Sequence, residues 1–372
     1  MKKRSLPDDL PVQAGPPAGK KAPEIRPDSA HRTAPVTVIV PAYNESATIA
    51  ETIKSLQNQT LRPAEIIVVD DGSTDDTGQV ARSFGVAVLR PPARTGSKAG
   101  AQTFALDKVQ TEFTIAIDAD TTLAPDAIAR LFSVFADPAV AAACGSVLPR
   151  RIQTVWERGR YVEYLFAFTF YKRIQDQYGA PLISSGCFSM YRTAVLREVG
   201  GWPTRTLAED MDLTWTLYKK GYAVRFVPGA ICYPLEPHSY KFLKRQLRRW
   251  SHGFVQNVRL HRRDILGVPF LRSAVAVACW DAIVASLVYL LILPLAAIVF
   301  GKAYFLLGYV IDIPAIVVPV VVGAFLRRDV GRALVSLPSF FVLRTVNAVF
   351  FLMAIWSEFV RHRTYLVYEK GH

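Results

Sequence analysis

The sequence lacks the features of a secreted, disulfide-bonded or zinc-binding protein. Its 372 residues include only four cysteines, which lie far apart without a C-x-x-C pair, so neither a disulfide framework nor a zinc cage is indicated. The basic start of the chain, Met1–Arg4, is not followed by an apolar segment, because prolines and charges interrupt residues 6–35. We therefore expect no export signal and a reducing, cytosolic environment.

Motifs of nucleic-acid-binding proteins are absent as well, although the formal net charge is +13. No helix-turn-helix, zinc-finger or RNP-like pattern accompanies that charge. Nine lysines or arginines stand instead between residues 241 and 272 against one acid, Asp264, directly before a long apolar stretch. This placement favours an anionic lipid surface and phosphate groups as partners, and we predict that nucleic acid is not one.

The first 35 residues contain little that could pack into a core. They hold seven of the chain's 24 prolines, and few apolar side chains accompany them. We predict that residues 1–35 form a disordered cytosolic tail.

Beyond the tail, the chain alternates apolar β-branched runs with helical patterns. We expect strands over residues 36–40, 65–69, 86–89 and 113–117, and helices around residues 49–56 and over 75–84 and 99–109. Ser46 is expected to cap the first helix. The alternation predicts a doubly wound α/β sheet, whose ligands bind at the carboxyl ends of its strands.

A helix rich in aromatic residues is expected over residues 155–177. Its aromatic spacing fits a helix that lies on a membrane surface and equally an ordinary core helix.

Three apolar segments near the carboxyl end are candidates for membrane spans, over residues 282–300, 303–326 and 333–356. Three spans would place the basic tail outside, against the positive-inside tendency, so the third segment is either a span or a re-entrant or interfacial helix. The charges within and beside these segments, Asp281, Asp312 and Arg344, are expected to face protein, a pore or each other, or else to snorkel.

Acidic residues follow two of the predicted strands. Asp118 and Asp120 emerge at the end of residues 113–117, where two carboxylates could hold Mg²⁺ or Mn²⁺ against a diphosphate, although polar loop residues of this kind are also common without a metal. Asp70 ends residues 65–69, where it could accept hydrogen bonds from a base or ribose, or cap a helix. Lys98 lies in a turn of small residues that could approach phosphate, with a solvated lysine as the alternative.

Two further groups lie on predicted helices. Glu209 and Asp210 stand at the amino end of a helix, where they could cap it or supply the base that deprotonates an acceptor hydroxyl. Gln246, Arg249 and Trp250 share one helix face and could clamp a pyrophosphate and stack on a sugar, or form a basic interfacial helix.

The order of these motifs resembles family 2 glycosyltransferases, in particular the processive branch with cellulose, chitin, hyaluronan and poly-N-acetylglucosamine synthases. The likeness rests on Pro41-Ala-Tyr-Asn-Glu45, Asp70-Asp-Gly-Ser73, Lys98-Ala-Gly100, Asp118-Ala-Asp120, Ala208-Glu-Asp210 and Gln246-Leu-Arg-Arg-Trp250. It implies a Rossmann-like α/β domain of the GT-A type, an inverting mechanism and a UDP-sugar donor. N-acetylglucosamine is the first choice of sugar and glucose the second.

The resemblance also implies roles for individual residues. The segment that begins at Pro41 would bind the donor, with Tyr43, Glu45 and Asp70 on uridine and with Lys98 and Asp118 on ribose or diphosphate. Asp118 and Asp120 would hold the metal, and Asp210 would be the general base. Gln246, Arg249 and Trp250 would hold the diphosphate, with Trp250 beside the acceptor sugar. Acceptor contacts are expected from Ser185, Gly186, Cys187 and Glu209.

The same resemblance organises the chain. We expect a GT-A domain over residues 36–240, a basic interfacial region over 241–272, two to three transmembrane helices over 273–357 and a basic tail over 358–372. The protein would lie in the plasma membrane with its catalytic domain in the cytoplasm.

The acceptor would be a growing polysaccharide or, as the alternative, a polyprenyl phosphate or glycolipid that receives one sugar. So few spans imply a partner subunit or a homo-oligomer for export, or a short product. After Lys98-Ala-Gly100 the sequence Ala101-Gln-Thr103 departs from the family pattern.

Overall fold

The computed structural model describes residues 32–280, 286–310, 313–361 and 365. The predicted tail lies outside these residues as far as residue 31. Residues 32–35 already belong to the first strand, so the folded chain begins earlier than predicted.

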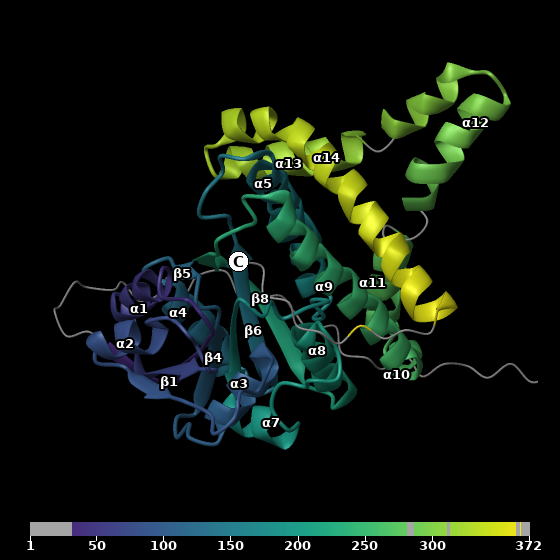
Figure 1. The fold of residues 1–372 in the computed structure, drawn as a ribbon. Helices are drawn as coiled ribbons and strands as arrows, with labels where there is room; N and C mark the ends of the chain where they lie inside the picture. The colour runs from purple at the N-terminus through teal and green to yellow at the C-terminus, as the bar shows by residue number, and fades with distance from the viewer. Residues whose placement is uncertain (1–31, 281–285, 311–312, 362–364, 366–372) are drawn as a thin grey trace, which may run out of the picture. The chain divides into compact units, whose positions relative to one another are not determined.

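The described residues contain one mixed sheet with the strand order β3-β2-β1-β4-β7-β6-β8-β5. Of these strands, Figure 1 labels β1, β4, β5, β6 and β8. The strands are β1 (Arg32–Ala42), β2 (Leu61–Asp70), β3 (Ala87–Leu89), β4 (Phe113–Ile117), β5 (Thr122–Leu123), β6 (Val140–Val147), β7 (Phe188–Arg192) and β8 (Ala223–Tyr233). The first four predicted strands are confirmed and pair in parallel. The second half is mixed, because β7 runs antiparallel to both of its neighbours.

Strand β7 matters for the site because of its register. Phe188, its first residue, pairs with Ile117, the last residue of β4. The loop before β7 and the loop after β4 therefore lie at the same edge of the sheet. Residues 185–187 are thereby brought beside Asp118, although about 70 residues of sequence separate them.

Helices cover both faces of the sheet. They are α1 (Ile49–Gln57), α2 (Thr77–Ser83), α3 (Lys98–Leu106), α4 (Ala127–Phe132), α7 (Thr193–Glu198) and α8 (Glu209–Lys219). On β1, Val38 and Val40 face the apolar cluster of α1, whereas Ile39 faces the cluster that contains Leu213 of α8. This alternation of buried side chains is what a strand covered on both faces requires.

The starts of two helices differ in their capping. Ser46 does not cap α1, contrary to prediction, because the helix begins after Thr48 and the Ser46 side chain hydrogen-bonds Asp75, which also accepts the Ser46 backbone N–H at 3.1 Å. Helix α3 begins at Lys98, and Ser97 caps it by accepting a hydrogen bond from the Gly100 N–H at 3.0 Å. The cap fixes the direction in which Lys98 leaves the turn.

The aromatic segment forms α5 (Val155–Phe166), a π-helical turn (Ala167–Tyr171) and α6 (Lys172–Gln177). Its buried face, with Tyr161 and Leu165, packs against Ile316 and Val320 of α13 (Ile313–Leu326). This contact favours the interpretation of the segment as a core helix over that of a helix on a membrane surface, although Phe170 is exposed.

The remaining helices are α9 (Tyr240–Leu260), α10 (Arg262–Gly267), α11 (Pro269–Cys279), α12 (Leu293–Val299) and α14 (Val330–Ile355). Two helical stretches in the described chain, Ala303–Leu326 and Val330–Val360, are long and apolar enough to cross a membrane. The first predicted span corresponds only to the shorter apolar helix Val288–Val299, and residues 281–285 lie outside the described residues. The Arg344 guanidinium lies 4.9 Å from the Tyr289 ring centroid, so it faces protein as predicted, while Asp281 and Asp312 lie outside the described residues.

Candidate active site

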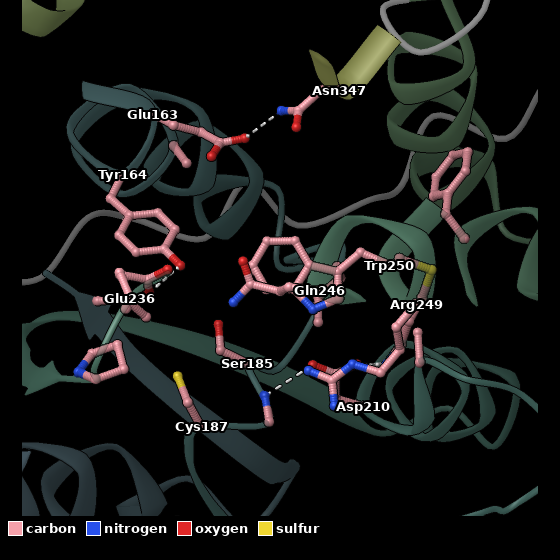
Figure 2. Close-up of a pocket in the computed structure, with 18 of the residues that line it drawn as sticks. Glu163, Tyr164, Ser185, Cys187, Asp210, Glu236, Gln246, Arg249, Trp250 and Asn347 are labelled. Atoms are coloured by element: carbon pink, nitrogen blue, oxygen red, sulfur yellow. Dashed lines mark hydrogen bonds between the residues drawn. The ribbon is translucent and has the colours of Figure 1, made fainter. Parts of the chain in front are cut away.

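A cavity of about 1360 Å³ opens at the carboxyl ends of β1 and β4 and extends towards α13 and α14. The predicted site residues that line it are Pro41, Tyr43, Glu45, Lys98, Asp118, Asp120, Ser185, Gly186, Cys187, Glu209, Asp210, Gln246, Arg249 and Trp250. Figure 2 shows Gln246 and Trp250 turned towards Ser185 from the opposite wall. The fold thus gathers motifs that are spread over some 200 residues of sequence.

Gly186 joins the predicted donor and base sides of the cavity. The Lys98 ammonium is ion-paired with Asp118 and donates a hydrogen bond to the Gly186 carbonyl oxygen at 2.9 Å. The Gly186 N–H in turn donates to Asp210 Oδ2 at 2.9 Å (Figure 2). A Cβ atom at residue 186 would lie 3.1 Å from that carboxylate oxygen and 3.2 Å from Lys98 Nζ, so only glycine fits without a shift.

The two carboxylates at the start of α8 have different surroundings. Burial raises the pKa of the Glu209 carboxyl, and the Lys98 ammonium 3.8 Å away lowers it in part. Asp210 accepts hydrogen bonds from the Gly186 N–H through one oxygen and from the Met211 N–H, at 2.8 Å, through the other. Asp210 therefore accepts a helix N–H, as the capping interpretation expects, and it also borders the cavity, where its role as a base stays a prediction.

The two aspartates at the end of β2, Asp70 and Asp71, point in different directions. Asp70 does not line the cavity, since its carboxylate is buried, accepts a hydrogen bond from the Ser73 N–H at 2.8 Å and packs against Gly78. Asp71 lines the cavity instead and accepts hydrogen bonds from the N–H of Thr95 and of Gly96. Adjacent residues at a strand end point to opposite sides, which explains the difference. The predicted uridine contact of Asp70 stays a prediction.

Arg94 is a cavity residue that the sequence did not single out. Its guanidinium lies 3.8 Å from the ring centroid of Tyr43, within the range of a cation–π contact. Glu45, beside them, is buried and accepts a hydrogen bond from Thr48 Oγ1 at 2.7 Å. No motif marks Arg94, because its partner stands 51 residues earlier in the chain.

Asp118 and Asp120 fit a divalent cation that takes its other ligands from a substrate. Both carboxylates border the cavity, and a third of the Asp118 side chain is exposed. The described residues contain no cluster of three or more His, Cys, Asp or Glu that could hold a metal by themselves. Mg²⁺ and Mn²⁺ commonly bind through one or two carboxylates together with phosphate and water oxygens, so the donor set present is of the right type.

A buried arginine holds the α9 residues in place. Arg160 of α5 donates to Gln246 Oε1 at 2.8 Å, and its guanidinium lies 4.5 Å from the Trp250 ring centroid. It is also ion-paired with Glu163 and lies 3.8 Å from Glu236 Oε2. Arg160 is fully buried, so losing it would leave these acids without their cation.

Glu236 and Glu163 extend this network in two directions. Tyr164 Oη donates to Glu236 Oε1 at 2.7 Å, and burial raises the pKa of the Glu236 carboxyl, with Arg160 opposing the shift (Figure 2). Asn347 of α14 donates to Glu163 Oε1 at 3.4 Å. The network therefore connects α9 to a helix that is apolar enough to span a membrane.

Helix α9 also positions the segment that precedes Asp210. Gln256 Oε1 accepts a hydrogen bond from the Leu207 N–H at 3.0 Å, and Asn257 Nδ2 donates to the Ala208 carbonyl oxygen at 3.1 Å. A Cβ atom at Gly253 would lie 2.7 Å from Ala208 Cβ, so the helix and the loop are in close contact. One helix thus presents Gln246, Arg249 and Trp250 and orients the candidate base.

The sheet has the Rossmann-like α/β fold of the GT-A type, and its paired carboxylates stand at the strand ends where such folds bind ligands. Residues 37–200 match the family model described as glycosyl transferase family 2. Residues 37–200 thus form a glycosyltransferase family 2 domain, in agreement with the predicted resemblance, and the predicted GT-A fold is confirmed.

Relatives and one solved structure add to this assignment. Poly-beta-1,6-N-acetyl-D-glucosamine synthase of Staphylococcus aureus (strain COL) is 28% identical over 222 residues, which cover 59% of this chain and 54% of that protein. The protein of the same name from Staphylococcus epidermidis (strain ATCC 35984) is 28% identical over 223 residues, with the same coverage. The chain thus spans about half the length of these curated relatives. The structure of the mannosyltransferase PcManGT from Pyrobaculum calidifontis, in complex with GDP-Man and Mn²⁺, matches with a TM-score of 0.58 and 21% identity over 91% of this chain and 90% of that chain.

Proposed function

We propose that this chain is an inverting glycosyltransferase that moves a sugar from a UDP-sugar to an acceptor hydroxyl, with Asp210 as the general base. The observation that carries the proposal is the continuous contact from Asp118 through Lys98 and Gly186 to Asp210 along one cavity wall. A diphosphate leaving group needs cations, and an attacking hydroxyl needs a carboxylate on the opposite face of the sugar. The wall offers both.

The donor side of the reaction falls to Lys98, Arg249 and the carboxylates after β4. A divalent cation bound by Asp118 and Asp120 would neutralise charge on the departing diphosphate. Lys98 would exchange its ion pair with Asp118 for a diphosphate oxygen, and Arg249 would approach the same group from α9. Tyr43 and Asp71 border the part of the cavity that is suited to the base and ribose.

The acceptor side falls to residues 185–187, Glu209 and Trp250. The acceptor hydroxyl would give its proton to Asp210 as its oxygen bonds to the anomeric carbon and the bond to UDP breaks. Glu209, which lines the cavity next to Asp210, would accept a hydrogen bond from a sugar hydroxyl. The Arg160 guanidinium contacts the Trp250 ring, and this ring offers a face on which a sugar would stack.

The choice of sugar rests on the relatives. The matched staphylococcal proteins are named as synthases of poly-β-1,6-N-acetylglucosamine, which supports UDP-N-acetylglucosamine as the first donor to test and UDP-glucose as the second. A growing polysaccharide at the cytoplasmic face of the plasma membrane is the corresponding acceptor, and the basic region 241–272 suits contact with anionic lipid. Export of a polymer would then require a partner subunit or a homo-oligomer.

Transfer of one sugar to a lipid-linked acceptor is the second candidate. It is favoured by the apolar end of the cavity, where Ile316, Phe340 and Phe351 of α13 and α14 form the lining. Such a surface suits the hydrocarbon chain of a glycolipid or polyprenyl acceptor better than it suits a polar glycan.

A donor screen tests both candidates. Membranes that contain the full chain would be given UDP-N-acetylglucosamine, UDP-glucose or GDP-mannose, each with Mn²⁺ or with EDTA. We expect UDP release and sugar incorporation with one UDP-sugar and loss of both in EDTA, and product size separates a polymer from a single transfer. If no donor supports release beyond that of an Asp210→Asn control, the proposed function is wrong.

A further inference from the structure

Helix α6 places two buried hydrogen-bond donors on the wall of the cavity. Lys172 and Gln175 lie three residues apart, so they share a helix face, and both line the cavity. Their exposed fractions are 7% and 4%, which is rare for residues of these types. The proposed transfer reaction assigns no role to either residue.

The polar contacts of both side chains are incomplete. Lys172 Nζ donates to Ser185 Oγ at 2.7 Å and lies 5.0 Å from the Phe168 ring centroid, and no acid in the described part of the chain forms an ion pair with it. Gln175 Oε1 accepts from the Leu182 N–H at 3.0 Å, whereas its Nε2 has no hydrogen-bond partner among the described residues. A buried ammonium and a buried amide N–H each cost free energy until an oxygen acceptor reaches them.

The position of this pair relates it to the acceptor. Ser185, the partner of Lys172, directly precedes Gly186, which donates to Asp210. A group held by Lys172 therefore lies on the acceptor side of the candidate base, away from the loops of β1 and β2. Figure 2 shows Ser185 between Cys187 and Asp210 on the cavity floor.

On its other side the pair borders the apolar helices. The π-helical turn Ala167–Tyr171 leads directly into Lys172, and Thr169 within it packs against Gly323 of α13, where a Cβ atom would lie 2.9 Å from the threonine side chain. Turns of this kind often occur at functional sites. Lys172 thus lies close to the point where the polar end of the cavity gives way to the apolar end.

We infer that Lys172 and Gln175 form a phosphate-binding subsite, and that the acceptor is a lipid-linked sugar phosphate. Its apolar chain lies along α13 and α14, its phosphate accepts a hydrogen bond from Lys172 Nζ, and its sugar hydroxyl reaches Asp210. Gln175 Nε2, which is fully enclosed in this structure, turns to the same phosphate when the acceptor binds. The inference rests on the proposed function for the role of Asp210, and of the two acceptors proposed above it selects the lipid-linked one. An ammonium beside an amide donor selects an anionic oxygen over a neutral glycan hydroxyl.

Binding without a donor tests the subsite independently of transfer. The purified full chain in detergent would be titrated with geranylgeranyl phosphate and with geranylgeraniol, which share the apolar chain and differ in the phosphate. We expect the phosphate to bind about tenfold tighter or more, equivalent to ~1.4 kcal/mol. The preference should disappear in Lys172→Met, fall in Gln175→Leu and return in Lys172→Arg. Lys220→Met, at an exposed lysine paired with Glu198, is the matched control and should keep it.

The outcomes separate the alternatives. Equal affinity of the wild type for phosphate and alcohol, or a preference that survives in both Lys172→Met and Gln175→Leu, overturns the inference. Competition by millimolar inorganic phosphate as strong as that by the lipid phosphate would identify a free-anion site and overturn the lipid assignment. Absence of UDP release in the donor screen would instead overturn the proposed function and would leave this binding result unaffected.

Discussion

The donor half and the acceptor half of the cavity are held together by different means. In the donor half, the loops after β1 and β2 lock through short polar contacts, such as the Asn44 N–H to Ser73 Oγ at 3.0 Å and the Thr74 N–H to Asn44 Oδ1 at 2.8 Å. In the acceptor half, a fully buried guanidinium, Arg160, joins α5 to α9 and to the acid that follows β8. The loops of the donor half rely on backbone N–H groups bound by hydroxyl, amide and carboxylate oxygens above an apolar core, whereas the acceptor half relies on a buried ion-pair network around Arg160.

This difference predicts different responses to damage. A neutral hydrogen bond near the surface contributes about 1 kcal/mol, whereas removing one partner of a buried ion pair costs about 3–5 kcal/mol. Donor binding should therefore tolerate single substitutions better than the acceptor side does. Four substitutions test this contrast, in order of decreasing expected effect.

Asp210→Asn should have the largest effect, because it should abolish most of the transfer activity and leave donor binding nearly unchanged. The amide oxygen can still accept the Gly186 hydrogen bond, but the side chain can no longer take the acceptor proton, so transfer should fall by about 10²–10⁴-fold. UDP affinity, measured by calorimetry, should stay within about threefold of the wild type (~0.7 kcal/mol). Equal loss of binding and of transfer would remove Asp210 from the base role.

Arg160→Met should destabilise the acceptor half by about 3 kcal/mol or more, because Glu163 and Glu236 lose their buried cation. Thermal unfolding of the full chain in one detergent measures the effect. The control is Arg130→Met, which removes an exposed ion pair with Asp126 and should cost under about 1 kcal/mol.

A triple variant sharpens this result. Arg160→Met combined with Glu163→Gln and Glu236→Gln removes the unpaired charges and should recover part of the lost stability. If Arg160→Met alone unfolds at the same temperature as Arg130→Met, the acceptor half does not depend on buried charge.

Gly159→Ala probes the contact between α5 and α14. The added Cβ would lie 2.9 Å from both Leu343 Cβ and the Ser339 carbonyl oxygen, so overpacking should cost about 1–3 kcal/mol in thermal unfolding. Gly331→Ala, near the start of α14, meets no atom within 4 Å and should stabilise the helix by about 0.5–1 kcal/mol. Identical unfolding temperatures for the two variants would mean that α14 does not pack on α5 as the structure shows.

Asp75→Asn should have the smallest effect, in the donor half. Burial raises the pKa of Asp75, but hydrogen bonds from Thr77 and Ser46 outweigh it and lower the pKa to about 2. A lowered pKa adds stability above the unfolded value of about 3.8, and that stability is lost as the pH falls towards 2.

For this exposed carboxylate the contribution should stay below about 1 kcal/mol. Unfolding followed between about pH 5 and 2 should show a weaker pH dependence in Asp75→Asn than in the wild type, and Asp76→Asn is the control. If unfolding of Asp75→Asn depends on pH as that of the wild type does, then groups other than Asp75 cause the loss of stability at low pH.

The sequence predicted the donor half in more detail than the acceptor half. The strand over residues 113–117, the turn before Lys98 and the acidic strand ends follow from local patterns and are present in the structure. The motif predicts Asp70 as the donor contact, whereas Asp71 lines the cavity, because a local pattern does not reveal which of two neighbours faces a cavity. The sequence predicts Ser46 as the cap of α1, but a capping hydroxyl can be engaged by a tertiary contact, and here the Ser46 side chain hydrogen-bonds Asp75.

The acceptor half depends on partners that are distant in the sequence. Arg160 and Gln246 stand 86 residues apart, and nothing around Arg160 marks it beyond an aromatic helix. Lys172 likewise resembles a surface lysine until α6 is placed against the cavity. Buried charges of this kind become recognisable only when the packing of the helices is known, since burial is a property of the fold.

Gly186 has a consequence for the timing of the reaction. Its carbonyl oxygen is bound by the lysine proposed to receive the diphosphate, and its N–H is bound by the proposed base, so only the φ and ψ torsions of one glycine lie between them. When Lys98 turns to a donor, the carbonyl loses its partner and the loop gains freedom next to Asp210. On the proposed function, the acceptor pocket would thus acquire its working shape only after the donor has arrived, and the two substrates would bind in sequence.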